Sequence, residues 1–227
     1  MILVQADTST PELLDHVKAN LNESLKVPLI HSTSLQSFEE SPSFEELPVF
    51  VGKDHTLTAR AFQLFSKNFS KPGIIMFDAH LDLIENKTVR TLIDTLKVPP
   101  ENILVVGARS IRAAELASLR QTRLKVYPMR EIISEGIQNV CDSVMSVAKN
   151  FGALFVSIDL DVVDPIFAPA VLAKEPAGMS SRELIYFIQR LKLLRNLKAF
   201  DVMGFLPEKD TQEITLKLLV KIVQEAY

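Results

Sequence analysis

The sequence has little cysteine, no long apolar run and no excess of basic residues, and each lack excludes a class of protein. Its single cysteine, Cys141, rules out an internal disulfide framework and agrees with a reducing compartment. No apolar stretch approaches the roughly 20 residues that cross a bilayer. The N-terminal residues turn polar after MILV, so we expect no signal peptide. A net charge of −3 provides no basic surface for nucleic acid or membranes. We therefore expect a cytoplasmic globular protein that binds neither.

The order of apolar runs predicts an α/β fold. Of the 227 residues, 47% are hydrophobic and 23% are charged, which is ordinary for a globular protein. Short apolar runs predict strands over residues 1–4, 47–51, 73–77, 103–107, 124–127, 153–158 and 199–202. The segments between them predict helices over residues 11–21, 56–68, 88–96, 111–122, 135–150, 181–194 and 211–226. This alternation is typical of a mostly parallel sheet covered by helices.

Two other features concern the organisation of the chain. Residues 31–48 are rich in serine, glutamate and proline and predict an irregular loop. No internal repeat and no linker divides the sequence. Residues 1–227 are therefore expected to form a single domain.

Three of the predicted strands end in acidic residues and histidines. These are Asp54 and His55 after strand 47–51, Asp78, His80 and Asp82 after strand 73–77, and Asp159, Asp161 and Asp164 after strand 153–158. Ligands of an open parallel sheet bind beyond the carboxyl ends of its strands, so these side chains are expected to meet. Residues two apart in an extended chain point to one face, which would bring Asp78 to His80 and Asp159 to Asp161.

This set of residues favours a metal centre. Clustered carboxylates repel and raise one another's pKa unless a cation holds them. Two imidazoles with four or more carboxylates suit a hard or borderline divalent ion such as manganese better than a thiolate-type zinc site. The excess of carboxylate would balance two ions better than one. Two ions about 3.5–4 Å apart can hold a bridging water, lower its pKa and aim it at an electrophile.

Each motif taken alone also has a purely structural interpretation. A single D-x-D is commonly a solvated turn, and Asp54 can cap the helix over residues 56–68. Asp164, before Pro165, is predicted to form a turn and to bind no metal. Three such motifs at separate strand ends are much harder to explain in this way, so the metal centre is the favoured interpretation.

The same motifs resemble those of the ureohydrolase family, which includes arginase, agmatinase and formiminoglutamase. The family's GGDHS, DAHxD and SxDxDxxDP correspond, in the same order, to GKDHT (52–56), DAHLD (78–82) and SIDLDVVDP (157–165). VGARS (106–110) is similar to its IGxR segment, and FDVMGFLPEKD (200–210) to its DxxEVNPxxD. The resemblance covers roughly residues 47–227. It implies a three-layer α/β/α sandwich with a shortened N-terminal part, assembled as homotrimers or hexamers.

The resemblance also implies a dimanganese site with Mn²⁺ as the cofactor. One ion would be held by His55, Asp78, Asp82 and Asp159, and the other by Asp78, His80, Asp159 and Asp161. The family reaction is attack of a metal-bridging hydroxide on a guanidinium or imino carbon of a small-molecule substrate, which releases urea or an amide. Asp82 would be catalytic, because it would accept a hydrogen bond from the hydroxide and pass its proton to the leaving nitrogen.

The departures from the family pattern fall on substrate positions. Gly204 replaces the glutamate that holds the guanidinium, and Leu206 replaces the asparagine before the proline. The glycine-rich GTGT loop is AVLA (170–173), which stiffens that wall of the site and makes it more apolar. No histidine follows His80, so the downstream catalytic histidine of arginases is absent. The other two histidines are predicted to lie on the surface, and they are His16 and His31.

Arg112 stands where arginases place an acid that contacts the substrate amine. It is either a solvated arginine on the first turn of a helix or, if it faces the pocket, a substrate-binding residue that favours an anionic group. Lys53, in place of the second glycine of GGDHS, allows a weaker version of the same interpretation.

Three hypotheses follow for function. The first is a hydrolase of a linear C–N bond in a guanidino compound, of which agmatine is the simplest. The second is a hydrolase of a neutral or anionic formimino or amide compound. The third is a metal-binding homologue that has lost turnover and serves as a structural subunit. A purposeless buried carboxylate cluster is costly, which argues against the third. A buried guanidinium without a carboxylate partner is also costly, so Gly204 argues against a simple arginase or agmatinase.

Overall fold

The central feature of the fold is a parallel sheet. The structure is a computed structural model that describes residues 2–6, 15, 17–21 and 31–227. Its described strands form one eight-stranded sheet in the order β2–β1–β3–β8–β7–β4–β5–β6, and every neighbouring pair is parallel. The strands are β1 Ile2–Gln5, β2 His31–Ser34, β3 Pro48–Val51, β4 Pro72–Phe77, β5 Ile103–Val106, β6 Lys125–Tyr127, β7 Ala153–Asp159 and β8 Leu197–Met203.

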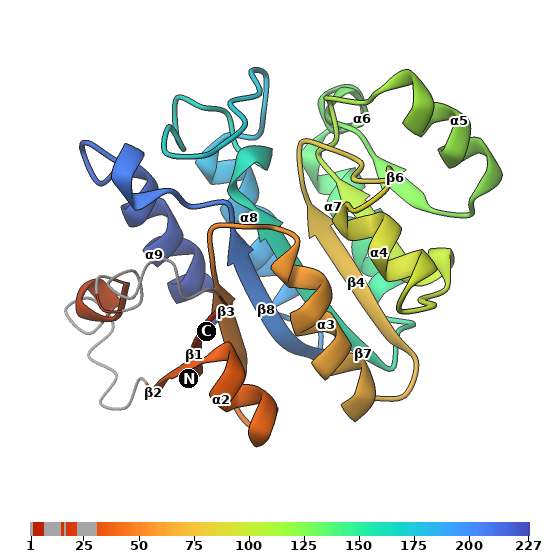
Figure 1. Cartoon of the computed structure of the whole chain (residues 1–227). Helices are drawn as coiled ribbons and strands as arrows, with labels where there is room; N and C mark the ends of the chain where they lie inside the picture. Colours follow the sequence, from red (N-terminus) through yellow and green to blue (C-terminus); the bar gives the residue numbers. More distant parts are fainter. Residues whose placement is uncertain (1, 7–14, 16, 22–30) are drawn as a thin grey trace.

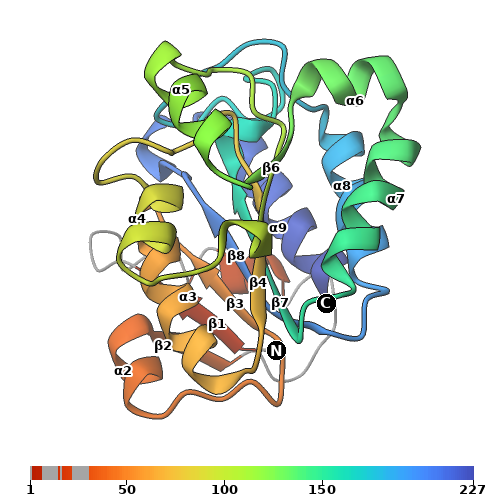
Figure 2. The same cartoon turned by 90° about the vertical axis from the view of Figure 1, so that its right-hand side faces the viewer.

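Helices cover both faces of this sheet (Figure 1). One face carries α2 Leu35–Glu40, α3 Leu57–Asn68, α4 Thr88–Asp94 and the partly buried side of α5 Ala113–Gln121. The other carries α6 Met129–Glu135, α7 Ile137–Ala148, α8 Ser181–Leu191, α9 Ile214–Ala226 and the helical residues 17–21. Figure 2 shows α2, α3 and α4 on one side of the sheet and α7 and α8 on the other. Short 3-10 helices are η1 Pro100–Asn102, η2 Leu160–Val162 and η3 Pro207–Lys209.

The strands are apolar on both faces because both faces are buried. Successive residues of one strand enter different cores: Val49 and Val51 pack with α8 and α9, whereas Phe50 packs with α2 and α3. On the face covered by α2 and α3, the ring of Phe155 lies 5.8 Å from Phe62 and 6.1 Å from Phe50, measured between ring centroids. Burying one of these phenylalanine side chains fully stabilises the folded state by about 1.5–3 kcal/mol relative to leaving it exposed. Layers of this kind fix the strands so that their carboxyl ends form one edge.

The predicted three-layer α/β/α sandwich with a mostly parallel sheet is confirmed. All seven predicted strands are present, and none of their ends differs from the prediction by more than two residues. The helices predicted over 56–68, 88–96, 111–122, 181–194 and 211–226 are also present, each slightly shorter than expected. Of the helix predicted over 11–21, residues 15 and 17–21 are helical, and the rest lie outside the described part of the chain.

The prediction of an irregular loop over residues 31–48 is wrong. This segment contains β2 and α2. Strand β2 is a serine- and threonine-rich edge strand that pairs only with β1 among the described strands, so it carries little apolar signal. Helix α2 is six residues long and buries only Leu35 and Phe38. It begins where the Ser34 hydroxyl accepts a hydrogen bond from the Ser37 N–H at 3.1 Å.

The helix predicted over residues 135–150 is present as α7, slightly shorter than expected. A second helix, α6, precedes it and was not predicted; it begins after Pro128 and ends at Glu135. Gly136 separates the two helices with φ of +84°, a left-handed conformation that glycine adopts without strain. Among the described residues, none of the helices combines the length and the apolar character needed to span a membrane.

Candidate metal centre

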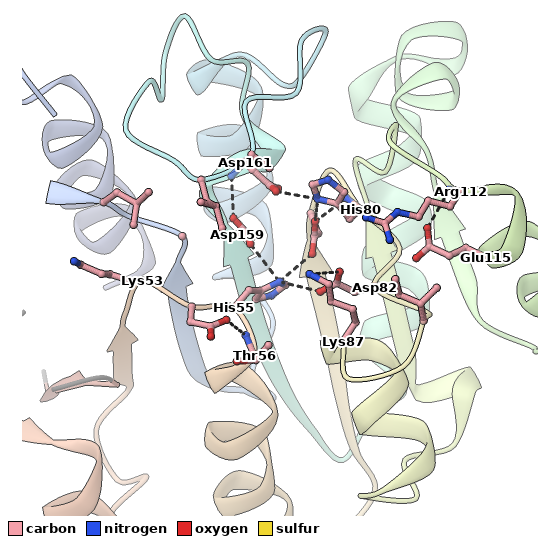
Figure 3. Close-up of a pocket in the computed structure, with 17 residues that line it drawn as sticks. Lys53, His55, Thr56, His80, Asp82, Lys87, Arg112, Glu115, Asp159 and Asp161 are labelled. Carbon is pink, nitrogen blue, oxygen red and sulfur yellow. Dashed lines mark hydrogen bonds and ion pairs between the residues drawn. The ribbon is translucent and has the colours of Figure 1, made fainter. Parts of the chain in front are cut away.

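A cavity of ≈ 460 Å³ opens at the carboxyl edge of the four central strands β3, β8, β7 and β4. It lies where the sheet order places strands far apart in sequence side by side, which is the usual position of a ligand site in parallel α/β folds. The lining residues come from the loops after these strands and from the start of α5 (Figure 3). They are Lys53, Asp54, His55, Thr56, Asp78, His80, Asp82, Ile84, Lys87, Arg112, Glu115, Asp159, Asp161, Leu172, Ala173, Gly204 and Leu206.

The first half of the cluster surrounds the Nδ1 atom of His55. This nitrogen lies 2.9 Å from Asp78 Oδ2, 3.4 Å from Asp159 Oδ2 and 3.7 Å from Asp82 Oδ2. Three strands supply these groups, since His55 follows β3, Asp78 and Asp82 follow β4, and Asp159 ends β7. A ring nitrogen and carboxylate oxygens from His55, Asp78 and Asp82 all lie within 4.8 Å of one another, which is close enough to hold one ion.

The second half of the cluster is arranged around His80 in the same way. His80 Nδ1 lies 2.9 Å from Asp161 Oδ2 and 3.4 Å from Asp78 Oδ1. Asp78, His80 and Asp161 form a second group whose ligand atoms lie within 4.8 Å of one another. Asp78 belongs to both groups, with one carboxylate oxygen facing each histidine. All six residues predicted to bind metal therefore lie together in one site.

The route by which these side chains converge differs from the prediction. Strand alternation was expected to align Asp159 with Asp161, but β7 ends at Asp159 and Asp161 lies in η2. The Asp161 N–H donates to Asp159 Oδ1 at 3.0 Å, and the His80 N–H donates to Asp78 Oδ1 at 2.7 Å. The Ala79 N–H donates to Asp161 Oδ1 at 3.1 Å and joins the two loops. Tight turns stabilised by the carboxylates themselves position the cluster.

Burial and mutual repulsion destabilise the charged form of most of these carboxylates. Burial, followed by the charge of Asp161, raises the pKa of Asp159 well above its ordinary value. Burial and the charge of Asp78 raise the pKa of Asp82 and of Asp161. Asp78 differs, because burial raises its pKa but contacts with the two histidines outweigh this and lower it. A cation in the cluster would relieve the repulsion.

The two histidines are affected in the opposite sense. Burial lowers the pKa of His55, but the carboxylates of Asp78, Asp159 and Asp201 outweigh it and raise the pKa to about 10. Hydrogen bonds to Asp161 and Asp78 raise the pKa of His80 to about 11. The negative charge of the cluster thus stabilises positive charge at both histidines.

The donor set fits a pair of divalent ions. His55 Nδ1 is buried and has no partner with hydrogen-bond geometry among the described residues, although Asp78 Oδ2 lies only 2.9 Å away. A buried nitrogen and a carboxylate oxygen this close, without hydrogen-bond geometry between them, form an arrangement that a bound cation would satisfy. Oxygen-rich ligands with two imidazoles suit manganese-type ions.

The positions that depart from the ureohydrolase pattern line the same cavity. Leu172 and Ala173 of the AVLA segment form an apolar wall, as predicted, and Leu206 lies beside them in the lining. Gly204 has φ of +86°, and a Cβ atom added to it would lie 2.5 Å from Asp159 Oδ1. A side chain at this position therefore conflicts with both the backbone and a carboxylate of the cluster.

Three cationic side chains also line the cavity. Arg112 is exposed and faces it, with its backbone N–H donating to Glu115 Oε2 at 3.0 Å (Figure 3). Lys87 Nζ lies 3.9 Å from Asp82 Oδ1. Lys53 Nζ lies 3.1 Å from Glu208 Oε2. These three side chains form a basic rim, next to the acidic side chains of Asp54 and Glu115.

The remaining sequence predictions concern single polar residues. Asp164 forms a turn as predicted, because its carboxylate accepts from the N–H groups of Ile166 and Gly178. Asp54 does not cap α3 as predicted, because Thr56 is the N-cap residue; its carboxylate instead accepts from the Thr56 N–H at 2.9 Å in the turn before the helix. The surface placement predicted for His16 and for the side chain of His31 lies outside the described residues.

Several residues that support the site from outside the cavity were not predicted from the sequence. The Arg109 guanidinium donates to the carbonyls of Asp161 at 2.7 Å and Val162 at 3.0 Å, and it also binds the Glu175 and Pro176 carbonyls. It thereby ties the loop after β7 to the loop after β5. The VGARS segment was the available signal, but it did not reveal what the arginine contacts.

A second group that was missed lies beneath His55. Ser157, Thr58 and Asp201 are fully buried and connect β7, α3 and β8 by hydrogen bonds. Burial raises the pKa of Asp201 to about 6, although the charge of His55 and the Ser157 and Thr58 hydroxyls oppose the rise. The serine of SIDLD and the aspartate of FDVMG were the available signals.

Comparison with known proteins identifies the family of this chain. The sequence profile described as the Arginase family matches residues 7–227. The chain belongs to the arginase family. It is thus an arginase-family hydrolase, and the metal dependence of this family agrees with the two candidate ligand groups. The resemblance to ureohydrolases seen in the sequence motifs is confirmed.

Relatives with different names match this chain about equally well. An arginase of Staphylococcus aureus (strain COL) is 25% identical over 209 residues, which span 82% of this chain and 69% of that protein. A formimidoylglutamase of Halalkalibacterium halodurans is 24% identical over 205 residues, which span 86% of this chain and 64% of that protein. Both names belong to the relatives, and the pair leaves the substrate of this chain open.

Solved structures of the arginase family have the same fold. An arginase from Bacillus subtilis superposes with a TM-score of 0.88 at 20% identity, covering 99% of this chain and 96% of that one. A formimidoylglutamase from the same species gives a TM-score of 0.87 at 17% identity, covering 99% of this chain and 84% of that one. At these identities the likeness concerns the fold.

Proposed function

We propose that this protein is a hydrolase that uses two divalent metal ions, with Mn²⁺ as the preferred ion, to cleave a linear C–N bond of a small amidine or amide compound. The observation that carries the proposal is the convergence of two histidine Nδ1 atoms and four aspartates in one cavity. Without a cation, such a buried cluster of carboxylates destabilises the folded protein, and its ligands are numerous enough to bind two ions.

The proposed ligands are shared between the two ions. His55, Asp78, Asp82 and Asp159 would hold one ion, and Asp78, His80, Asp159 and Asp161 would hold the other. When bound, the pair would supply an activated water as the nucleophile. Asp78 and Asp159 are suited to the shared role because each lies in contact with residues of the other group.

Asp82 is the proposed proton carrier. Burial raises the pKa of its carboxyl, which makes it a better proton acceptor than an ordinary aspartate. It lies on the wall of the cavity, with Lys87 Nζ 3.9 Å away, so it faces the space that substrate would enter. It would take a proton from the attacking water and deliver it to the nitrogen that leaves.

The shape and charge of the cavity favour a neutral or anionic substrate. Gly204 replaces the glutamate with which the family holds a guanidinium, and Asp159 leaves no room there for a side chain. Both oxygens of Glu115 accept backbone N–H groups, from Leu83 and Arg112, so this carboxylate is already engaged. A formimino or amide compound that carries a carboxylate would instead pair with the basic rim.

A guanidino substrate, with agmatine as the simplest, is the second candidate. Asp54 favours it, because its exposed carboxylate lines the cavity and accepts a hydrogen bond from Thr56 through Oδ1 alone among the described residues. A cationic group at the rim would be attracted to Asp54. This attraction is weaker than that of a buried carboxylate, because water screens an exposed charge.

A substrate screen distinguishes the two candidates. Protein loaded with Mn²⁺ would be incubated with guanidino, formimino and amide compounds, while urea and ammonia are both measured. We expect ammonia from a formimino or amide compound and no urea from arginine or agmatine. Urea release from agmatine would instead establish the guanidino candidate. A protein that binds no divalent ion, or that turns over none of these compounds when loaded, would contradict the proposed function.

Arg112 is the proposed substrate-binding residue, and its role gives a mutational prediction. We expect Arg112→Gln to raise KM for an anionic substrate roughly two- to fivefold, because an exposed ion pair contributes about 0.2–1 kcal/mol. The kcat should stay unchanged, since the side chain lies at the rim. Arg120→Gln is the matched control, because Arg120 is in the last turn of the same helix and does not line the cavity. Equal effects of the two substitutions, or a fall in kcat alone, would contradict this role.

Two broader features are also proposals. Family resemblance supports a homo-oligomer, trimeric or hexameric, and the single, buried Cys141 agrees with a reducing, cytoplasmic location. Size-exclusion chromatography with light scattering would test the first, and tagging of the chain in its own cell would test the second.

A further inference from the structure

The feature that the proposed function leaves unexplained is a carboxylate in the protein core. Asp201 lies inside β8, between Phe50 of β3 and Ser157 of β7, and is fully buried. It is not among the residues that line the cavity. A buried carboxylate is costly unless it is paired or fully hydrogen-bonded. Its Oδ2 accepts one hydrogen bond, whereas Oδ1 has no partner with hydrogen-bond geometry among the described residues. Its position therefore requires an explanation.

Asp201 is the end of a chain of buried hydrogen bonds that leads to His55. The Thr58 hydroxyl donates to Asp201 Oδ2 at 2.8 Å. The Thr58 and Ser157 hydroxyl oxygens lie 3.3 Å apart, and Ser157 Oγ lies 3.1 Å from His55 Nε2. Thr58, Ser157 and Asp201 are fully buried and His55 nearly so, so water does not compete with these contacts.

The carboxylate fixes the direction of every donor in this chain. An ionised carboxylate only accepts, so the single hydrogen of the Thr58 hydroxyl is directed to Asp201. Thr58 can then only accept from Ser157. The Ser157 hydrogen is used on Thr58 or on the nearby Asp201 carboxylate, so toward His55 Ser157 can only accept. His55 Nε2 must therefore carry a proton. Nδ1 is then the ring nitrogen left to bind a metal ion in place of a proton, and it faces Asp78, Asp159 and Asp82.

We infer that Asp201, through Thr58 and Ser157, is a positioning residue that holds His55 in the tautomer and orientation needed to bind a metal ion through Nδ1. The inference rests on the proposed function, because His55 is a ligand in that proposal. Partners of this kind behind a metal-bound histidine fix its ring and raise its basicity. This role explains why Asp201 is buried. If its carboxylate were exposed, water could donate to it, and the Thr58 hydroxyl would no longer be required to do so.

The test measures Mn²⁺ affinity in titrations of metal-free protein, so it does not require a known substrate. Thr58→Val keeps the shape of the side chain and removes the hydroxyl that links Asp201 to Ser157. Ser157→Ala removes the acceptor of His55 Nε2 and leaves the bond between Thr58 and Asp201 intact. We expect each to weaken one of the two Mn²⁺ binding steps by about 10- to 100-fold and to leave the other near its original affinity.

Two further variants separate positioning from general loosening of the fold. Thr58→Ser retains the hydroxyl and is expected to restore normal affinity. Thr88→Val is the matched control, because Thr88 is also a buried threonine that donates to His55, but to its backbone carbonyl at 3.1 Å. It is expected to lower the melting temperature without changing either affinity. Thermal melts followed by circular dichroism identify any variant that fails to fold. If Thr58→Val does not fold, Ser157→Ala alone provides the test.

Three outcomes would overturn either the positioning role or the proposed function. Normal two-step binding in both Thr58→Val and Ser157→Ala would overturn the positioning role while leaving the proposed function intact. Equal weakening in Thr88→Val and Thr58→Val would also overturn it, because the effect would then be structural. Failure of the unmodified protein to bind Mn²⁺ would overturn the proposed function, together with the inference that depends on it.

Discussion

Asp78→Asn is expected to abolish hydrolysis and to weaken both metal ions together. Asp78 is the one residue present in both candidate ligand groups, with Oδ2 2.9 Å from His55 Nδ1 and Oδ1 3.4 Å from His80 Nδ1. The substitution removes the shared negative charge. An asparagine oxygen can still accept the His80 N–H that now binds Asp78 Oδ1 at 2.7 Å, so the turn is expected to persist. We expect activity to fall roughly 10³-fold or more, equivalent to about 4 kcal/mol of transition-state stabilisation.

The measurements are Mn²⁺ titration of metal-free protein and turnover at saturating Mn²⁺. Asp164→Asn is the matched control. Asp164 belongs to the same SIDLDVVDP segment as two proposed ligands, but its carboxylate accepts the Ile166 and Gly178 N–H groups and lies outside the cavity. The control should bind two ions and keep its activity. Retention of both ions by Asp78→Asn would contradict the proposed centre.

Gly204→Glu is expected to damage the site instead of converting it to a guanidine site. Comparison of motifs alone suggests the opposite result, because glutamate is the family residue at this position. The structure gives two reasons for failure. The backbone has φ of +86°, and a Cβ would lie 2.5 Å from Asp159 Oδ1. A non-glycine residue in this conformation costs of order 1–3 kcal/mol, before any displacement of the carboxylate.

Gly204→Ala isolates the effect of the Cβ atom from that of a new charge. We expect it to weaken Mn²⁺ binding and activity roughly 10- to 100-fold, because Asp159 must move. Gly136→Ala is the matched control, since Gly136 has φ of +84° but nothing lies within 4 Å of an added Cβ. It should lose stability of order 1–3 kcal/mol from a similar positive φ and retain normal metal binding. Urea release from agmatine by Gly204→Glu with two bound ions would contradict this interpretation.

Much of the fold was predictable because its signals are local. A parallel sheet buried on both faces requires continuous apolar strands, and runs such as 73–77 and 153–158 are unmistakable. Segment 31–48 was not predictable, because β2 depends on its pairing with β1 and α2 buries only two residues. Helix α6 shows the same limit, because it is short and buries only Met129 and Ile132.

The candidate site was predictable to a similar extent. The order of GKDHT, DAHLD and SIDLDVVDP identified six side chains that the fold brings within a few ångströms of one another. The chain of hydrogen bonds behind His55 was not predictable. Thr58, Ser157 and Asp201 are separated by up to 143 residues in sequence, and only the adjacency of β7 and β8 beside α3 brings them together.

The family, the layered α/β architecture and the identity of the candidate ligands follow from short segments of the sequence, because the chemistry of each segment can be recognised without its neighbours in space. Tertiary structure decided the rest. It decided which nitrogen of each histidine faces the carboxylates, that Asp78 is shared, and that Gly204 has no space for the side chain it replaces. These properties depend on distances between strands, and a linear sequence does not specify such distances until the sheet order is known.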